Sequence, residues 1–154
     1  MRPGKQFEAE AGQALKAVGS FRLNQNAEHG ACDWVGIYRG LGFVLECKEV
    51  RSDRLSFSAI TVRERAQLDA INDRGGLGLV GIKWIGSNWS RAFLICWSDW
   101  LELEKRPPRS IPLSDGLRPL VLTEVGRVDR PNSLGRAWEL RPFLQQQLMK
   151  WRST

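Results

Sequence analysis

The chain has 154 residues, 42% of them hydrophobic, which suits one domain with a hydrophobic core over residues 1–154 and is short for two. It has no run of roughly 20 apolar residues and no apolar leader, which argues against a membrane span or a secretory signal and leads us to expect a cytoplasmic protein. The net charge of +6 favours a polyanionic partner, while one histidine and three cysteines without a Cys-x-x-Cys pair argue against a zinc site.

The first predicted elements are a helix and a hairpin. Apolar residues recur at helical spacing over about residues 3–18, and Gly19 supplies a stop. Two apolar strands follow, joined by a tight turn at residues 39–41. Glu46 and Lys48 lie on the second strand and point to one face, because alternate side chains of a strand do so. If the hairpin turns where we expect, Asp33 returns to the same end of the ladder.

Two carboxylates and one ammonium group would then meet at one place. Carboxylate oxygens are the ligands that Mg²⁺ prefers, and a lysine beside them can position or help to deprotonate a water. This pattern outlines a phosphodiester-cleaving site. The alternative is a solvated hairpin face with an ordinary Glu–Lys pair. The apolar strand residues 43–45 favour the site, because charges on a buried strand are costly unless they are paired or bind a metal.

The rest of the chain predicts an α/β fold. After a basic loop at residues 51–54, the capping-box pattern Thr61–Glu64 starts a helix that ends before Gly75-Gly76. Strands at 77–85 and 92–97, a helix at 98–105, an extended segment at 119–125 and a last helix at 141–151 follow. This order indicates a mixed central β-sheet flanked by helices. We interpret the cysteines as reduced core residues; they are Cys32, Cys47 and Cys96.

Several stretches carry a resemblance to a known family. The helix–strand–strand–helix–strand order with an Asp and then Glu-x-Lys is similar to the PD-(D/E)XK nuclease superfamily, whose core is restriction-endonuclease-like. Within it the chain resembles the RecU-type Holliday-junction resolvases. The stretches that match are 4–8 in the opening helix, 33–40 in the hairpin, 46–49 (Glu-Cys-Lys-Glu), 65–67 in the second helix, Gly75-Gly76, and 110–113. The resemblance covers about residues 4–125 and leaves a loop-rich region and a C-terminal helix at 126–154.

The resemblance implies a Mg²⁺-dependent endodeoxyribonuclease, in which Mn²⁺ can substitute and no organic cofactor takes part. Asp33 and Glu46 would bind the metal, with help from the backbone carbonyl of Cys47. Glu8 would complete the acidic cluster, directly or through a water, although a solvated helix position is its alternative. Lys48 would orient or activate the attacking water. Gln67 would support the water or a neighbouring ligand, or be an ordinary helix-surface glutamine.

The expected substrate is a four-way DNA junction, which a homodimer would resolve by paired nicks during recombination and repair. We expect basic residues near the site to contact phosphates; they are Arg51, Arg54, Arg63 and Arg65. The segment before Asp33 is shorter than the protruding stalk of the family, which suggests a compact, phage-encoded version that acts in the host cytoplasm. Two alternatives stay open: a nuclease of this superfamily for other branched or duplex DNA, and a non-catalytic DNA-binding module with this fold. Trp34 and Trp89 are candidates either for DNA stacking or for packing.

Overall fold

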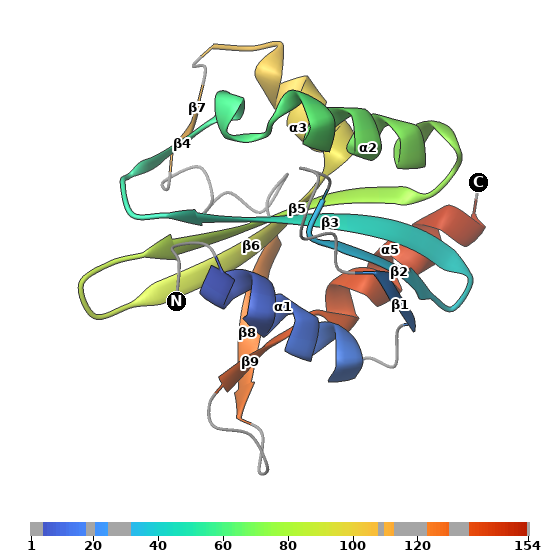
Figure 1. Ribbon diagram of the computed structural model, residues 1–154, viewed down its shortest axis with the longest axis horizontal. Helices are drawn as coiled ribbons and strands as arrows, with labels where there is room; N and C mark the ends of the chain where they lie inside the picture. Colours follow the sequence, from blue (N-terminus) through green and yellow to red (C-terminus); the bar gives the residue numbers. More distant parts are fainter. Residues whose placement is uncertain are drawn as a thin grey trace.

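The computed structural model describes residues 5–17, 21–24, 32–107, 110–112, 123–129 and 136–153, and these form a mixed β-sheet with helices on both faces (Figure 1). The helices are α1 (Lys5–Ala17), the 3-10 helix η1 (Phe57–Ala59), α2 (Val62–Asp73), α3 (Trp97–Glu104) and α5 (Arg141–Arg152). The strands are β1 (Phe21–Asn24), β2 (Trp34–Tyr38), β3 (Leu41–Val50), β4 (Arg54–Ser56), β5 (Leu77–Ile85), β6 (Ser90–Cys96), β7 (Ser110–Pro112), β8 (Thr123–Asp129) and β9 (Arg136–Glu139). The predicted α/β class with a mixed central sheet is therefore confirmed.

Strand β3 joins the β2–β3 hairpin to the rest of the main sheet. Within the described residues the main sheet runs in the order β1-β2-β3-β5-β6-β8-β9, and β4 pairs separately with β7. Strand β3 is antiparallel to β2 and parallel to β5, which the crossover through α2 makes possible. The β2–β3 turn consists of Arg39 and Gly40, whose φ angles of 47° and 90° are those that a two-residue hairpin turn requires.

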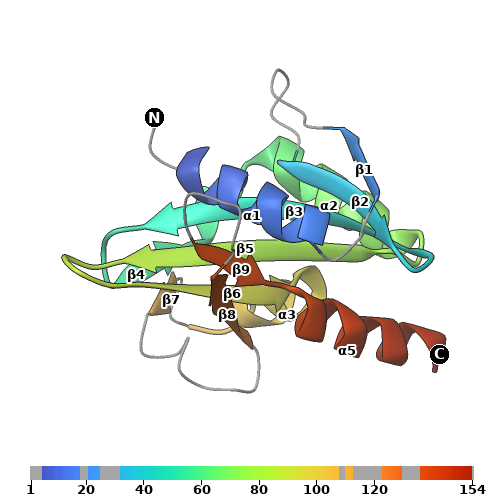
Figure 2. The ribbon, with the colours of Figure 1, turned by 90° about the horizontal axis from the view of Figure 1, so that it is seen from below.

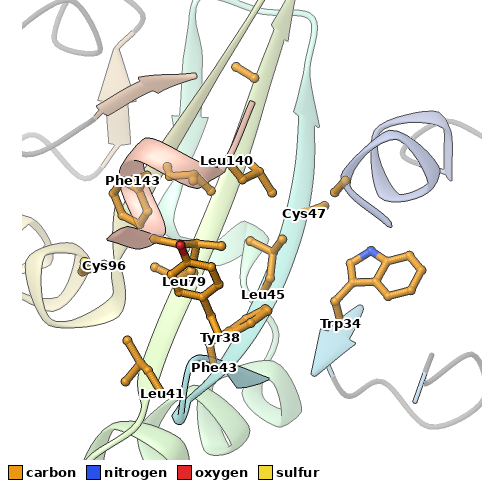
Figure 3. Packing of buried hydrophobic residues seen from close by; sticks show 14 of the residues in the cluster. Trp34, Tyr38, Leu41, Phe43, Leu45, Cys47, Leu79, Cys96, Leu140 and Phe143 are labelled. Carbon is orange, nitrogen blue, oxygen red and sulfur yellow. The ribbon is translucent and has the colours of Figure 1, made fainter. Parts of the chain in front are cut away.

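Both faces of the sheet are covered, which produces two hydrophobic cores. Helices α1 and α5 cover one face (Figure 2). Figure 3 shows Trp34, Leu45 and Cys47 on this face, with Leu140 and Phe143 from the start of α5. Helices α2 and α3 cover the other face, whose core contains Val44, Leu68, Val80 and the buried tryptophans Trp84, Trp97 and Trp100. Burial on both faces explains why β5 is almost continuously apolar.

Helix α1 lies unusually close to β2. A Cβ atom on Gly12 would lie 2.5 Å from the indole ring of Trp34, so only glycine permits this approach. The indole Nε1 of Trp34 also donates a hydrogen bond to the backbone carbonyl of Glu8 at 3.0 Å. Trp34 is 3% exposed, which identifies it as a packing residue. Trp89, in the β5–β6 turn, is 42% exposed, and DNA stacking by this residue stays a prediction.

The sequence predicted the long elements and missed the short ones. The hairpin, α2 with its capping box, β5, β6 and α5 lie where we expected them, and the three cysteines are buried and free. The strand expected at 119–125 is wrong in its extent: residues 123–125 belong to β8, which continues to Asp129, and residues 119–122 lie outside the described ones. Strands β1, β4, β7 and β9 were not predicted, because strands of three or four residues are defined by their partners rather than by a periodic pattern. Gly19 also lies outside the described residues. None of the helices that the structure describes is long and apolar enough to cross a membrane.

Candidate functional site

The candidate site lies where the ladder between β2 and β3 ends. The last backbone pair joins Trp34 and Leu45. Beyond it, the amide of Asp33 donates to Glu46 Oε2 at 3.2 Å, and the amide of Cys47 donates to Asp33 Oδ2 at 2.8 Å. The carboxyl groups of Asp33 and Glu46 therefore lie together at this end of the hairpin, as its geometry predicted.

Lys48 completes the group and links β3 to α2. Its Nζ lies 3.1 Å from Glu46 Oε1, and 3.1 and 3.3 Å from the two carboxylate oxygens of Glu64. Glu64 is held by the capping box of α2: its Oε1 accepts the Thr61 amide at 2.9 Å, and its own amide donates to Thr61 Oγ1 at 3.2 Å. The Lys48 side chain is 21% exposed, against 5% for Glu46 and 8% for Glu64. Solvent therefore reaches the ammonium group more readily than either of these carboxyl groups.

Burial and crowding of negative charge shift the pKa values of these groups. Burial, followed by the charge of Asp33 and a hydrogen bond with Glu64, raises the pKa of Glu46 to about 9. Burial by itself would raise the pKa of Glu64. Hydrogen bonds with Glu46 and with the Thr61 amide, together with the charge of Lys48, outweigh burial and lower this pKa. Burial by itself would lower the pKa of Lys48, but the charges of Glu46 and Glu64 and their hydrogen bonds outweigh burial and raise this pKa. The directions of these shifts favour, at neutral pH and without a metal, one proton held between Glu46 and Glu64 and a charged Lys48.

Gln67 lies on α2 next to this group. Its Oε1 accepts the amide of Cys32 at 2.7 Å, and Cys32 Sγ donates to the backbone carbonyl of Glu64 at 3.7 Å. Helix α2 therefore holds the residue that precedes Asp33. A contact between Gln67 and a reacting water stays a prediction.

Glu8 belongs to α1, which covers the face of β3 opposite to Glu46 and Lys48. Glu49, which points to the α1 face, accepts the amide of Phe7 at 3.0 Å and so ties the first turn of α1 to β3. The Glu8 side chain is only 5% exposed, so its interpretation as a solvated helix residue is wrong. Burial first, and then the charges of Asp33, Glu46 and Glu8, raise the pKa of the Cys47 thiol. Glu8 is therefore close enough to influence β3 at this point, and its part in metal binding stays a prediction.

The donor set was tested against the Mg²⁺ ion that the sequence predicted. Among the residues that the structure describes, no group of three or more His, Cys, Asp and Glu side chains could hold a metal ion. Asp33 and Glu46 nevertheless supply two carboxyl groups, and Mg²⁺ is commonly held by one or two carboxylates with several waters. The Cys47 amide points toward Asp33. Because the amide and the carbonyl of one strand residue point to the same edge of the strand, the Cys47 carbonyl oxygen also points to the edge where Asp33 lies.

The charges also fit a cation. Lys48 pairs with Glu46 and Glu64, and Asp33 lies beside Glu46, so three carboxyl groups lie near one ammonium group; the charge of Asp33 accordingly contributes to the raised pKa of Glu46. A divalent cation would remove this excess of negative charge. These carboxyl groups are compatible with Mg²⁺ or Mn²⁺, and binding of either ion stays a prediction.

The four predicted phosphate contacts fall into two groups. Arg51, Arg54 and Arg63 are exposed, and Arg54 Nη1 donates to Ser110 Oγ at 3.1 Å. The guanidinium group of Arg65 instead donates to the Phe57 carbonyl at 3.0 Å, pairs with Glu104, and lies over the Trp97 ring at 5.4 Å. Arg65 therefore joins η1, α2 and α3, and we no longer expect it to contact DNA. Phosphate contacts by the other three stay predictions.

Sequence reasoning missed the role of Glu64. Its capping-box position was recognised, and that local role appeared to explain the residue fully. Its contact with Lys48 depends on how α2 packs on β3, for which the sequence has no direct signal. The tie between Glu49 and Phe7 was missed for the same reason. A usable signal was available at Glu64, since a carboxylate in the first turn of the helix after Glu-x-Lys can face that strand.

No model of a protein family matches this sequence, and no curated protein matches it significantly. The resemblance to RecU-type resolvases therefore depends on the motifs quoted above and stays a prediction.

Proposed function

We propose that this protein is a metal-dependent, structure-selective DNA endonuclease of the PD-(D/E)XK type that resolves four-way junctions. One observation carries the proposal: the half-buried Asp33 and the buried Glu46, linked through backbone amides, lie together at the end of a ladder between two strands, and Glu46 pairs with Lys48. Holding acidic side chains together in this way costs free energy, which a bound cation would offset.

Each residue has a defined part in the proposed reaction. Asp33 and Glu46, with the Cys47 carbonyl, would hold the cation, which supplies Lewis-acid stabilisation of the negative charge on the scissile phosphate. Lys48 is the most exposed of the three paired side chains, so it can reach a phosphate oxygen or the attacking water. The raised pKa keeps Lys48 charged at neutral pH, which favours electrostatic stabilisation and water orientation over proton abstraction. Cleavage would leave 5′-phosphate and 3′-hydroxyl ends, as in the family that the chain resembles.

The order of elements supports the nuclease core. Helix α1, the β2–β3 hairpin, α2 and the parallel strand β5 follow one another as the resemblance requires, and β3 carries Glu46 and Lys48 between its two neighbours. The net charge of +6 and the exposed Arg51, Arg54 and Arg63 suit a DNA backbone. A four-way junction has near two-fold symmetry, so a homodimer would present two sites to opposed strands.

A cleavage assay on a fluorescent synthetic four-way junction tests the proposal, with a linear duplex of the same arms as the comparison. The wild-type protein is compared with Asp33→Asn, which can keep the hydrogen bond from the Cys47 amide but loses the charge. Asp73→Asn, at an exposed position near the end of α2, is the matched control. We expect Mg²⁺-dependent paired nicks on the junction, which Asp33→Asn abolishes and Asp73→Asn preserves.

The other outcomes separate the alternatives. Equal cleavage of junction and duplex, lost in Asp33→Asn, would keep the metal site and assign a nuclease of broader substrate range. Junction binding without cleavage in either Mg²⁺ or Mn²⁺ would refute the enzymatic proposal and leave a DNA-binding module.

A further inference from the structure

Lys48 is held by carboxylates from two different elements. Glu46 lies two residues away on the same strand, whereas Glu64 belongs to α2, sixteen residues along the chain. Both oxygens of Glu64 lie within hydrogen-bond distance of Lys48 Nζ, at 3.1 and 3.3 Å, while Glu46 contributes one oxygen at 3.1 Å. Glu64 is therefore at least an equal partner of the ammonium group.

Glu64 is also rigidly placed. Its side chain is 8% exposed. The carboxylate of Glu64 accepts a hydrogen bond from the Thr61 amide, and the backbone amide of Glu64 donates one to the Thr61 hydroxyl group. Its carbonyl accepts the thiol of Cys32, and Leu68, one turn further along α2, is fully buried against the sheet. A carboxylate fixed in this way can hold a flexible lysine side chain in one position.

A cation at the proposed site would weaken the contact between Lys48 and Glu46. The ion would repel the ammonium group of Lys48, and a Glu46 oxygen that coordinates the ion is a weaker hydrogen-bond acceptor for Lys48 than the same oxygen without the ion. Without a second anchor, Lys48 would move away toward solvent, to which it already has access. Glu64 supplies opposite charge from the α2 side, and no metal ligand is needed for that contact.

We propose that Glu64 is the positioning residue of Lys48, which keeps the ammonium group at the site after a cation has bound to Asp33 and Glu46. This inference rests on the proposed nuclease function and adds to it a residue outside the Asp and Glu-x-Lys motif. In this role Glu64 acts on the reaction through Lys48.

The capping box permits a clean separation of the two roles of Glu64. Gln serves as well as Glu at this position of a capping box, so Glu64→Gln keeps the helix cap and removes the charge. Thr61→Ala removes the hydroxyl acceptor and keeps the charge, while the backbone amide at position 61 still donates to the carboxylate. Comparison of the two variants therefore distinguishes the anchoring of Lys48 from helix capping.

The first test measures Lys48 directly, by acetylation with an N-hydroxysuccinimide ester and mass spectrometry, with and without Mn²⁺. The exposed Lys105 serves as the internal reference. In the wild-type protein and in Thr61→Ala, we expect Lys48 to remain slow to react when Mn²⁺ is added. In Glu64→Gln, Mn²⁺ should increase the rate at Lys48 by about tenfold relative to Lys105. Equal responses in Glu64→Gln and the wild type, or the same response in Thr61→Ala, would overturn the inference.

The second test measures single-turnover cleavage of the junction. Because a residue that supports a reacting group typically contributes 10- to 100-fold, we expect Glu64→Gln to lower the cleavage rate by roughly that factor. The DNA concentration at half-saturation should stay unchanged, and Thr61→Ala should cleave at the wild-type rate. An unchanged rate in Glu64→Gln, beside an active wild type, would refute the positioning role alone. Absence of cleavage in the wild type would instead refute the proposed function, while the acetylation result would still decide whether Glu64 holds Lys48.

Discussion

The buried carboxyl group of Glu46 should make the stability of this protein depend on pH in a specific way. Replacing Glu46 by Gln removes the titrating group, and the amide can still donate to Glu64 as the protonated carboxyl does. Burial, then the charge of Asp33 and the hydrogen bond with Glu64, raises the pKa of Glu46 to about 9 from 4.5. The folded protein therefore holds this proton more tightly than the unfolded chain does. The stabilising contribution of Glu46 is complete below about pH 4.5 and is lost as the pH rises to about 9.

The magnitude follows from linkage. A single proton gives a limiting slope of about 1.4 kcal/mol per pH unit inside this window. Lys48 and Glu64 share the change of charge, so we expect about half of that slope, which amounts to roughly 2 kcal/mol between about pH 6 and pH 9. The wild type should lose this amount relative to Glu46→Gln. The loss is large beside a typical total stability of about 5–15 kcal/mol.

Urea denaturation of both proteins at several pH values, without divalent cations, measures the difference. The difference between Glu46→Gln and the wild type should increase steadily with pH across the window. Glu102→Gln, at an exposed position of α3 where the carboxylate pairs with the exposed Lys105, is the control and should show no such trend. A difference between Glu46→Gln and the wild type that stays constant from pH 5 to pH 9 would refute the argument that Glu46 is protonated in the metal-free site.

Three further predictions follow from the same contacts. Cation binding should release a proton from Glu46, so the affinity for Mn²⁺ should rise by up to about tenfold per pH unit below pH 9. Calorimetry in buffers of different ionisation enthalpy should detect the released proton, and a pH-independent affinity would contradict this prediction. Arg65→Gln should lower the unfolding free energy by about 2 kcal/mol and leave DNA affinity unchanged, because its guanidinium group pairs with Glu104 inside the fold. In contrast, Arg63→Gln should reduce the slope of log K against log salt by about 0.9, and an equal effect on the slope in both arginine variants would be evidence against our division of these residues. Leu68→Ala should cost about 3 kcal/mol in urea denaturation, because this side chain is fully buried between α2 and the sheet, and a cost below about 1 kcal/mol would show that α2 packs differently.

The site could be predicted from the sequence to the extent that it is local. The period of a strand puts Glu46 and Lys48 on one face, and a tight turn between two apolar strands returns Asp33 to their level. These relations depend only on backbone geometry and on residues within one hairpin, and the structure shows the expected proximity. The capping box at Thr61 and Glu64 was equally local and is present.

The contacts of α2, α1 and Arg65 were beyond such reasoning. Whether Glu64 faces Lys48, or Gln67 faces Cys32, depends on the rotation and height of α2 above the sheet, which many core side chains set together. The burial of Glu8 depends in the same way on how α1 docks on β2 and β3. Arg65 looked like a surface base in the sequence, and its internal contacts arise only when η1, α2 and α3 come together.

By itself, the sequence determined the longer strands and helices, the α/β class and the proximity of Asp33 to the Glu46–Lys48 end of β3, because hydrophobic periodicity and turn chemistry act over a few residues. Only the tertiary structure decided that Lys48 lies between two carboxyl groups and that Glu46 is buried, which raises its pKa. Desolvation and the charge of neighbouring groups produce both effects. They depend on which elements pack over the strand, and no short stretch of sequence specifies that packing.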